Sequence, residues 1–93
     1  MNIQISTKFA THLHRLLGNG YADFELEDKE LLEELDQWIT LFCNHDYAPT
    51  PIFYLTKDCI IVYSRSSKNM LKEREGVKRF ETWTPVKTAI KNL

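Results

Sequence analysis

The densest apolar run in the chain spans residues 52–64 and is interrupted near its middle by the polar pair Lys57-Asp58. Both flanks of this pair are rich in β-branched and aromatic side chains, which favour strands. The pattern therefore predicts a β-hairpin formed by residues 52–56 and 59–64. Because both strands are apolar almost throughout, we expect either central strands covered on both faces or strands with one covered face and one binding face.

A first amphipathic helix is predicted to begin after Ser6 or Thr7, since either hydroxyl can cap a helix N-terminus. Residues 18–20 read Gly-Asn-Gly and end this helix, because Gly and Asn accept the left-handed conformation of a C-terminal cap. The helical spacing of its apolar residues predicts one buried face. That face consists of Phe9, Leu13, Leu16 and Leu17.

A second helix is predicted from Asp28, a good N-cap residue, to residues 44–46. Its acidic residues Glu30, Glu33 and Glu34 come early, near the positive end of the helix dipole. Apolar residues recur along it at helical spacing, which predicts that one side packs against the rest of the domain. This stripe consists of Leu31, Leu35, Trp38, Ile39 and Phe42.

Other segments complete the predicted set of elements. Alternating patterns predict strands over residues 2–6 and 21–26. A further strand is predicted over residues 77–83, and a short helix over residues 66–76. A last helix is expected to start at Thr84-Pro85, because a proline at the first helical position has no N–H to lose. Its apolar face consists of Val86, Ala89, Ile90 and Leu93.

The resulting fold class is α+β: a small antiparallel sheet built on the central hairpin, with amphipathic helices packed mainly on one face. The chain of 93 residues has the length of a single domain, and we assign residues 1–93 to one. Its 43% apolar and 27% charged residues are ordinary for a globular protein.

The cysteines and the apolar runs indicate in which cellular compartment the protein is expected. Cys43 and Cys59 are too few for a disulfide scaffold and are expected to be reduced thiols. The N-terminal residues lack the apolar core of a signal peptide, and no apolar run is long enough to span a membrane. We therefore expect a cytoplasmic protein without membrane contact.

No catalytic signature stands out in the sequence. Cys43 and His45 are the nearest approach to a metal motif, but zinc sites usually have a second ligand pair at matching spacing. His12 and His14 do not supply it, because residues two apart on a helix point away from each other. We expect no metal, no cofactor and no catalytic residue, and hence a protein that is not an enzyme.

The charge is distributed unevenly along the chain, although the net charge is only −1. Residues 1–50 hold three Lys and Arg against nine Asp and Glu, a net charge of −6, whereas residues 51–93 hold nine against four, a net charge of +5. The acidic run from Asp23 to Asp36 has three interpretations: a surface that docks on a basic partner, a mimic of nucleic-acid phosphates, or an ordinary solvated helix face. The near-zero net charge weighs against mimicry, and we expect docking to use Glu30, Glu33 and Glu34.

Basic residues are concentrated after the hairpin, close to Phe80 and Trp83, and such mixtures can hold phosphates and stack bases. A nucleic-acid-binding protein is therefore the first alternative function. Interrupting acidic residues and a pI of about 6.3 weigh against it. The basic set consists of Arg65, Lys68, Lys72, Arg74, Lys78 and Arg79.

A toxin-like ribonuclease is the second alternative function. The order of one strand, two helices and then strands resembles that of small ribonuclease toxins from bacterial toxin–antitoxin pairs. Those toxins are usually basic and place several Arg, Lys, His or Tyr residues on the sheet for RNA cleavage. The resemblance would give such parts to Tyr54, Tyr63 and Arg65, but the acidic second helix departs from the pattern and no motif is shared.

The function that we predict first is that of a small non-enzymatic protein-binding module, a modulator or inhibitor of another protein. Phages and mobile elements encode many short proteins that block host enzymes or host defence. A homodimer through an exposed edge of the hairpin is a further expectation, because unpaired strand edges template pairing. The expected partner-binding residues are Glu30, Glu33, Glu34, Tyr54, Tyr63, Arg65, Lys68, Lys72, Lys78 and Arg79.

Overall fold

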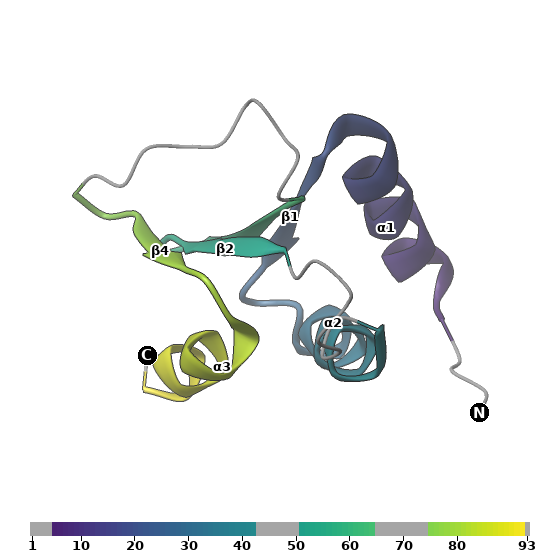
Figure 1. Ribbon diagram of the computed structural model, residues 1–93. Coiled ribbons are helices and arrows are strands. Elements are labelled where there is room, and N and C mark those ends of the chain that lie inside the picture. The colour runs from purple at the N-terminus through teal and green to yellow at the C-terminus, as the bar shows by residue number, and fades with distance from the viewer. Residues whose placement is uncertain (1–4, 43–50, 65–74, 93) are drawn as a thin grey trace.

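The computed structural model describes residues 5–42, 51–64 and 75–92. Figure 1 shows these residues as a sheet with α2 and α3 beneath the strands and α1 at the end where β1 lies. The predicted α+β class, with an antiparallel sheet built on a central hairpin, is confirmed. In chain order the elements are α1 (Thr7–Asn19), β1 (Tyr21–Glu25), α2 (Lys29–Phe42), β2 (Ile52–Leu55), β3 (Cys59–Tyr63), β4 (Lys78–Phe80) and α3 (Trp83–Lys91).

The sheet has the strand order β1-β3-β2-β4, and every neighbouring pair is antiparallel. The hairpin of β2 and β3 is therefore central, as predicted. Ala22 lies opposite Val62 and Phe53 opposite both Val62 and Phe80, which fixes the register across all four strands. Because β1 and β4 occupy both sides of the hairpin, the expectation that the hairpin has an exposed edge is wrong, and homodimerisation itself stays a prediction.

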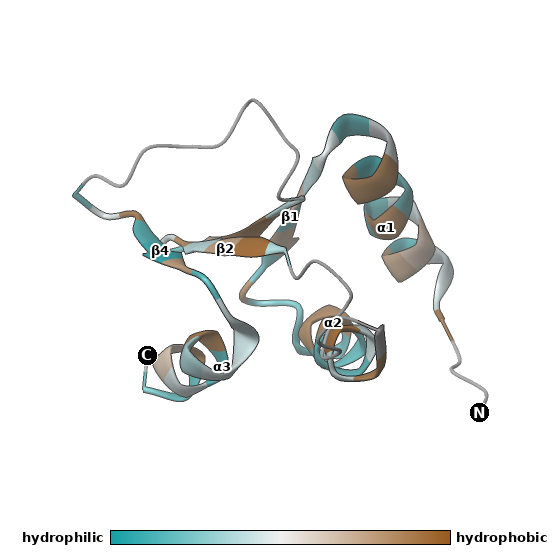
Figure 2. Cartoon of the chain, in the orientation of Figure 1, coloured by the Kyte–Doolittle hydropathy of each residue, from teal (hydrophilic) through white to brown (hydrophobic). Residues whose placement is uncertain are grey.

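Alternate residues of the strands and apolar residues of all three described helices form the main core. Leu17, which the sequence places on the buried face of the first helix, is 75% exposed, so that part of the prediction is wrong. In β1, for example, Ala22 and Phe24 are buried whereas the residues between and beside them are exposed. Each large apolar side chain that is fully buried contributes about 1.5–3 kcal/mol to the stability of the fold. Figure 2 shows apolar residues along α2 and α3, the two helices beneath the strands. The buried members are Phe9, Leu16, Ala22, Phe24, Leu31, Leu35, Ile39, Phe53, Ile60, Val62 and Val86.

Both ends of the first helix and the start of the second form as the sequence predicts. The Ser6 hydroxyl accepts a hydrogen bond from the N–H of Phe9 at 3.1 Å, so Ser6 is the N-cap of α1. Gly20 ends α1 in the left-handed conformation with φ of 86°. Asp28 caps α2, because its carboxylate accepts a hydrogen bond from the N–H of Leu31 at 3.1 Å.

The structure corrects the sequence-based boundaries near both ends of the chain. The strand expected over residues 77–83 is only Lys78–Phe80, because Thr82 already acts as the N-cap of α3, which begins at Trp83. Pro85 is thus the third residue of α3 instead of the first. Of the strand expected over residues 2–6, the described residues 5 and 6 are not in a strand.

Three other expectations fall wholly or mainly outside the described residues. They are the start of the strand at residues 2–4, the end of the second helix at residues 44–46 and the helix over residues 66–76, of which only 75 and 76 are described.

The opposite side of the sheet, which we call the second face, carries a smaller apolar cluster. It is formed by the buried residues Ile52, Tyr54 and Tyr63, with Ile61 and Val77 partly buried against them. Among the described elements, none of the helices contributes to this cluster. Tyr21, Asp23 and Glu25 of β1 share the second face, because they lie opposite Tyr63, Ile61 and Cys59.

Candidate functional site

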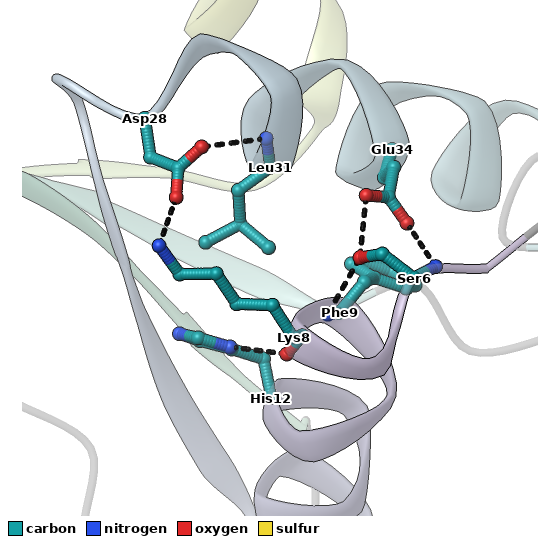
Figure 3. A network of polar contacts seen from close by, with 7 residues as sticks. All are labelled: Ser6, Lys8, Phe9, His12, Asp28, Leu31 and Glu34. Carbon is teal, nitrogen blue, oxygen red and sulfur yellow. Dashed lines mark hydrogen bonds and ion pairs between the residues drawn. The ribbon is translucent and has the colours of Figure 1, made fainter.

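Three acidic side chains of residues 1–50 form hydrogen bonds or ion pairs with other parts of the chain, and Glu34 is the clearest case. Its carboxylate accepts two hydrogen bonds from Ser6, one from the backbone N–H at 2.9 Å and one from the hydroxyl at 2.7 Å. Figure 3 shows how this carboxylate of α2 reaches the first turn of α1. A negative charge is stabilised there because the N-terminus of a helix is the positive end of its dipole.

Asp28 is the second acidic residue held by α1. Its carboxylate forms an ion pair with the ammonium group of Lys8 and also accepts the N–H of Leu31 (Figure 3). These interactions, with the Lys8 hydrogen bond first, lower the pKa of Asp28 below its ordinary value of 3.8. The same hydrogen bond raises the pKa of Lys8 above 10.5, with smaller contributions from the charges of Glu25 and Glu30.

Asp36 is the third, and it joins α2 to α3. Its Oδ1 atom accepts a hydrogen bond from the indole Nε1 of Trp83 at 2.7 Å and lies 3.3 Å from Nζ of Lys87. The indole ring packs at the same time against Phe53, with ring centroids 5.3 Å apart. Trp83 is therefore a structural residue at the junction of α2, α3 and the sheet.

The remaining acidic residues at this end of the molecule form a continuous exposed surface, which we call the acidic ridge. It consists of Asp23 and Glu25 of β1, Glu27 of the following turn, Glu30 of α2 and Asp58 of the hairpin turn. All five are exposed, and none forms an ion pair with another described residue.

Two adjoining hollows show that the ridge is continuous. One hollow, of about 440 Å³, is bordered by Asp23, Asp58 and Lys57. The other, of about 490 Å³, is bordered by Glu30, Lys29 and the Lys8–Asp28 pair. Both are also lined by Glu25 and Glu27, which join them. Together their walls hold six acidic and three basic side chains, so this surface is net negative.

The acidic residues singled out from the sequence have different positions. Glu30 and Glu33 are exposed on α2, as a partner-binding role requires. Glu34 is committed to Ser6 and so has a structural role. Asp23, Glu25 and Glu27 belong to the acidic run considered from the sequence but were not among the expected partner-binding residues, and Asp58 was missed. A signal was present for two of them, because a strand with Ala22 and Phe24 inward must turn Asp23 and Glu25 outward.

The tyrosines expected to meet a partner are buried. Tyr54 has no exposed area, and its buried hydroxyl has no hydrogen-bond partner in the described structure. Tyr63 is 5% exposed, and burial, followed by the charges of neighbouring groups, raises its pKa above 10.0. Its ring stacks on Tyr21, which is 39% exposed, at a centroid distance of 5.3 Å.

The described basic residues do not form a common patch. Lys78 and Arg79 are neighbours in β4 and therefore project from opposite faces of the sheet. Lys78 lies over the ring of Phe80 at 5.4 Å, and Arg79 pairs with Glu81 at 3.0 Å. Arg65, Lys68, Lys72 and Arg74 lie outside the described residues. Within the described chain, Trp83 is held by Asp36 and Phe53 and does not offer its ring to a base.

The described thiol and imidazole groups lie in ordinary structural positions. Cys59 is a free, half-buried thiol whose Sγ lies 3.4 Å from the hydroxyl of Thr56. Nδ1 of His12 lies 2.8 Å from the carbonyl oxygen of Lys8. In the described ranges, no three His, Cys, Asp or Glu side chains come close enough together to hold a metal ion. Cys43 and His45 fall outside those ranges. None of the described helices is long and apolar enough to cross a membrane.

Comparisons with known proteins assign no relative. No family model matches the sequence, no curated protein matches it, and no solved structure matches the fold. The geometry of the acidic ridge is therefore the starting point for function.

Proposed function

We propose that this chain is a small non-enzymatic protein-binding module that docks through its acidic ridge on a basic surface of another protein, and so modulates or inhibits it. The observation that carries the proposal is that some acidic residues are bonded within the molecule whereas those of the acidic ridge are exposed. Asp28, Glu34 and Asp36 are held by partners within the molecule. The five carboxylates of the ridge remain exposed and without ion pairs to other described residues.

The electrostatics of such a surface favour association with a basic partner. Like charges gathered on one surface sum to a field that extends about one Debye length, roughly 8–10 Å at physiological salt. Such a field accelerates encounter with an oppositely charged partner and excludes like-charged ones. Because ridge residues come from β1, α2 and the hairpin turn, the fold holds their backbone positions before binding, which lowers the entropic cost of association.

The proposed setting is the cytoplasm, where Cys43 and Cys59 would stay reduced. Because phages and mobile elements encode many short proteins that block host enzymes or host defence, we extend the proposal to that role. The nucleic-acid and ribonuclease alternatives have less support, because Trp83, Tyr54 and Tyr63 are engaged or buried within the fold.

The proposal is tested by capture of partners from a lysate of the native host, followed by quantitative mass spectrometry. The test variant carries Glu27→Gln and Glu30→Gln, which together change the net charge by two. The matched control is Glu75→Lys, which makes the same change in net charge at an exposed residue close to β4, at the other edge of the sheet. We expect the control to retain the wild-type partner and the test variant to lose it. A partner retained equally by all three chains would refute the proposed role of the ridge.

A further inference from the structure

The sheet has one long edge whose hydrogen-bonding groups point outward, the outer side of β1. The backbone groups of the even-numbered residues of β1 point toward β3. The bonds that flank the strand show this, since Ser64 N–H bonds to the Gly20 carbonyl at 2.8 Å and Leu26 N–H bonds to the Asp58 carbonyl at 3.0 Å. In an antiparallel pair such bonded positions alternate with positions whose groups point away. The backbone groups of Tyr21, Asp23 and Glu25 are therefore directed away from β3.

This edge is largely unused by the described part of the chain. The carbonyl of Glu25 accepts the N–H of Asp28 at 3.2 Å, but nothing described bonds to the N–H groups of Asp23 and Glu25. Helix α1 lies at the end of the sheet where β1 lies, and its Phe9 and His12 rings contact Phe24 on the helix-covered face, at centroid distances of 6.1 and 5.0 Å.

The opposite edge of the sheet offers much less. Strand β4 has only three residues. Lys78 and Phe80 lie opposite Leu55 and Phe53, whose backbone groups point away from β3 and toward β4. Only Arg79 of the three then directs its backbone groups outward. An added strand could be held by a row of bonds at β1 but not at β4.

The side chains along the β1 edge identify the chemistry of an incoming strand. Asp23 and Glu25 are exposed on the second face, and the 440 Å³ hollow that they line continues to Glu27 and Asp58. On an added strand, alternate side chains would stand beside these carboxylates on the same face. Opposite charges at such cross-strand positions stabilise the pairing.

We propose that β1 accepts an extended segment of the partner as an additional strand, and that this segment carries Lys or Arg at alternate positions. The inference rests on the proposed function and names how the acidic ridge recognises its partner, through backbone bonds for affinity and carboxylates for specificity.

A second copy of this chain fits the edge poorly. An antiparallel pair of β1 strands centred on Asp23 would place this carboxylate opposite its own copy and would bring the other acidic residues of β1 close together. Like charges directly opposite one another destabilise strand pairing. The acidic edge therefore favours a basic partner segment over self-association.

The test uses a synthetic peptide of alternating lysine and threonine, about seven residues long, which covers the five residues of β1 with one to spare at each end. A lysine opposite Asp23 would exchange both backbone bonds with it. Methylation of the lysine backbone nitrogens removes these donors and keeps the charges. Methylation of the threonine nitrogens is the matched control, because those N–H groups point away from β1.

Binding to the whole chain is followed by amide chemical shifts and amide hydrogen exchange. We expect the unmodified peptide to slow exchange at Asp23 and Glu25, lysine methylation to weaken binding about tenfold or more, and threonine methylation to change it much less. The variant Asp23→Asn/Glu25→Gln is expected to bind the unmodified peptide more weakly.

Three results would overturn the inference. Equal binding of all three peptides would show that the ridge holds basic segments without strand addition, which leaves the proposed function intact. Full binding by the Asn/Gln variant would remove the role of charge. Slowed exchange at Asp23 that appears with rising protein concentration alone would identify a second copy as the occupant. Failure of the proposed function is recognised separately, by a lysate partner that ignores Glu27→Gln/Glu30→Gln.

Discussion

The carboxylate of Glu34 accepts both the backbone N–H and the hydroxyl of Ser6, 28 positions earlier in the chain. Ser6 in turn caps α1 through Phe9. One acidic residue of α2 thus fixes the residue that starts α1, and the two helices are joined at that point. Glu34, which the sequence predicts to be a partner-binding residue, therefore has a structural role in joining the two helices.

Replacement of Glu34 by alanine should therefore destabilise the fold. The change removes the acceptor of two hydrogen bonds, and we expect the free energy of unfolding to fall by about 1–2 kcal/mol. Urea unfolding monitored by circular dichroism measures this. The control Glu33→Ala, at an exposed position of the same helix, should change it by no more than about 0.5 kcal/mol. Equal effects of the two substitutions would contradict the structural role of Glu34.

Protonation of Asp28 should weaken the α1–α2 contact in acid. Its pKa is lowered in the folded state, so its contribution is present above the ordinary value of 3.8 and is lost as the pH falls through the lower, folded value. Asp28→Asn should flatten the acid limb of a stability profile, whereas Asp58→Asn should leave it steep. The pKa of Lys8 is raised in the folded state, so its contribution to stability has the opposite pH dependence. That contribution is present below pH 10.5 and is lost as the pH rises through the folded pKa. An unchanged acid limb in Asp28→Asn would count against this coupling.

Removal of the Tyr54 hydroxyl should not weaken the protein. The oxygen is buried and has no hydrogen-bond partner among the described residues, and a buried unsatisfied group costs free energy. We expect Tyr54→Phe to be neutral or stabilising in thermal unfolding. Tyr54→Ala, which also removes the edge-on contact with Tyr63, should cost about 3–5 kcal/mol. A loss above about 1 kcal/mol in Tyr54→Phe would show that the hydroxyl has a bonding partner.

Asp36 should contribute to stability through Trp83 more than through Lys87. The indole bond is partly buried, whereas the side chains of the Lys87–Asp36 ion pair are 45% and 31% exposed, and solvent-exposed ion pairs contribute about 0–1 kcal/mol. Asp36→Ala should lower the free energy of unfolding by about 1–3 kcal/mol. Asp36→Asn should cost less, because the amide oxygen still accepts from the indole. Equal losses for the two variants in urea unfolding would point to the charge as the main contribution.

The local parts of the fold were predictable because the sequence signals act over short distances. Ser6 and Asp28 cap helices through residues three positions away, and the hairpin of β2 and β3 is marked by its own apolar pattern. The extent of β4 was not predictable in the same way. The apolar pattern continues through Trp83, but that side chain turns into the core as the first residue of α3 and bonds to Asp36, 47 positions earlier.

The candidate site depended on such distant pairs and was predicted only in part. The acidic character of the first half follows from composition, and Glu30 and Glu33 are exposed as expected. Which carboxylates remain available is decided by contacts between elements, such as those of Glu34 with Ser6 and Asp28 with Lys8. Asp58 joins the ridge only because the hairpin turn lies beside the end of β1, where Leu26 bonds to it.

The acidic ridge is tested most directly by the affinity of the captured partner for three forms of the chain: wild type, Glu27→Gln/Glu30→Gln and Glu75→Lys. The dissociation constant is measured by calorimetry at a low and a high salt concentration. We predict that wild type and Glu75→Lys bind alike, that salt weakens both, and that the double variant binds about tenfold more weakly at low salt. Equal dissociation constants for all three forms at low salt would contradict the account.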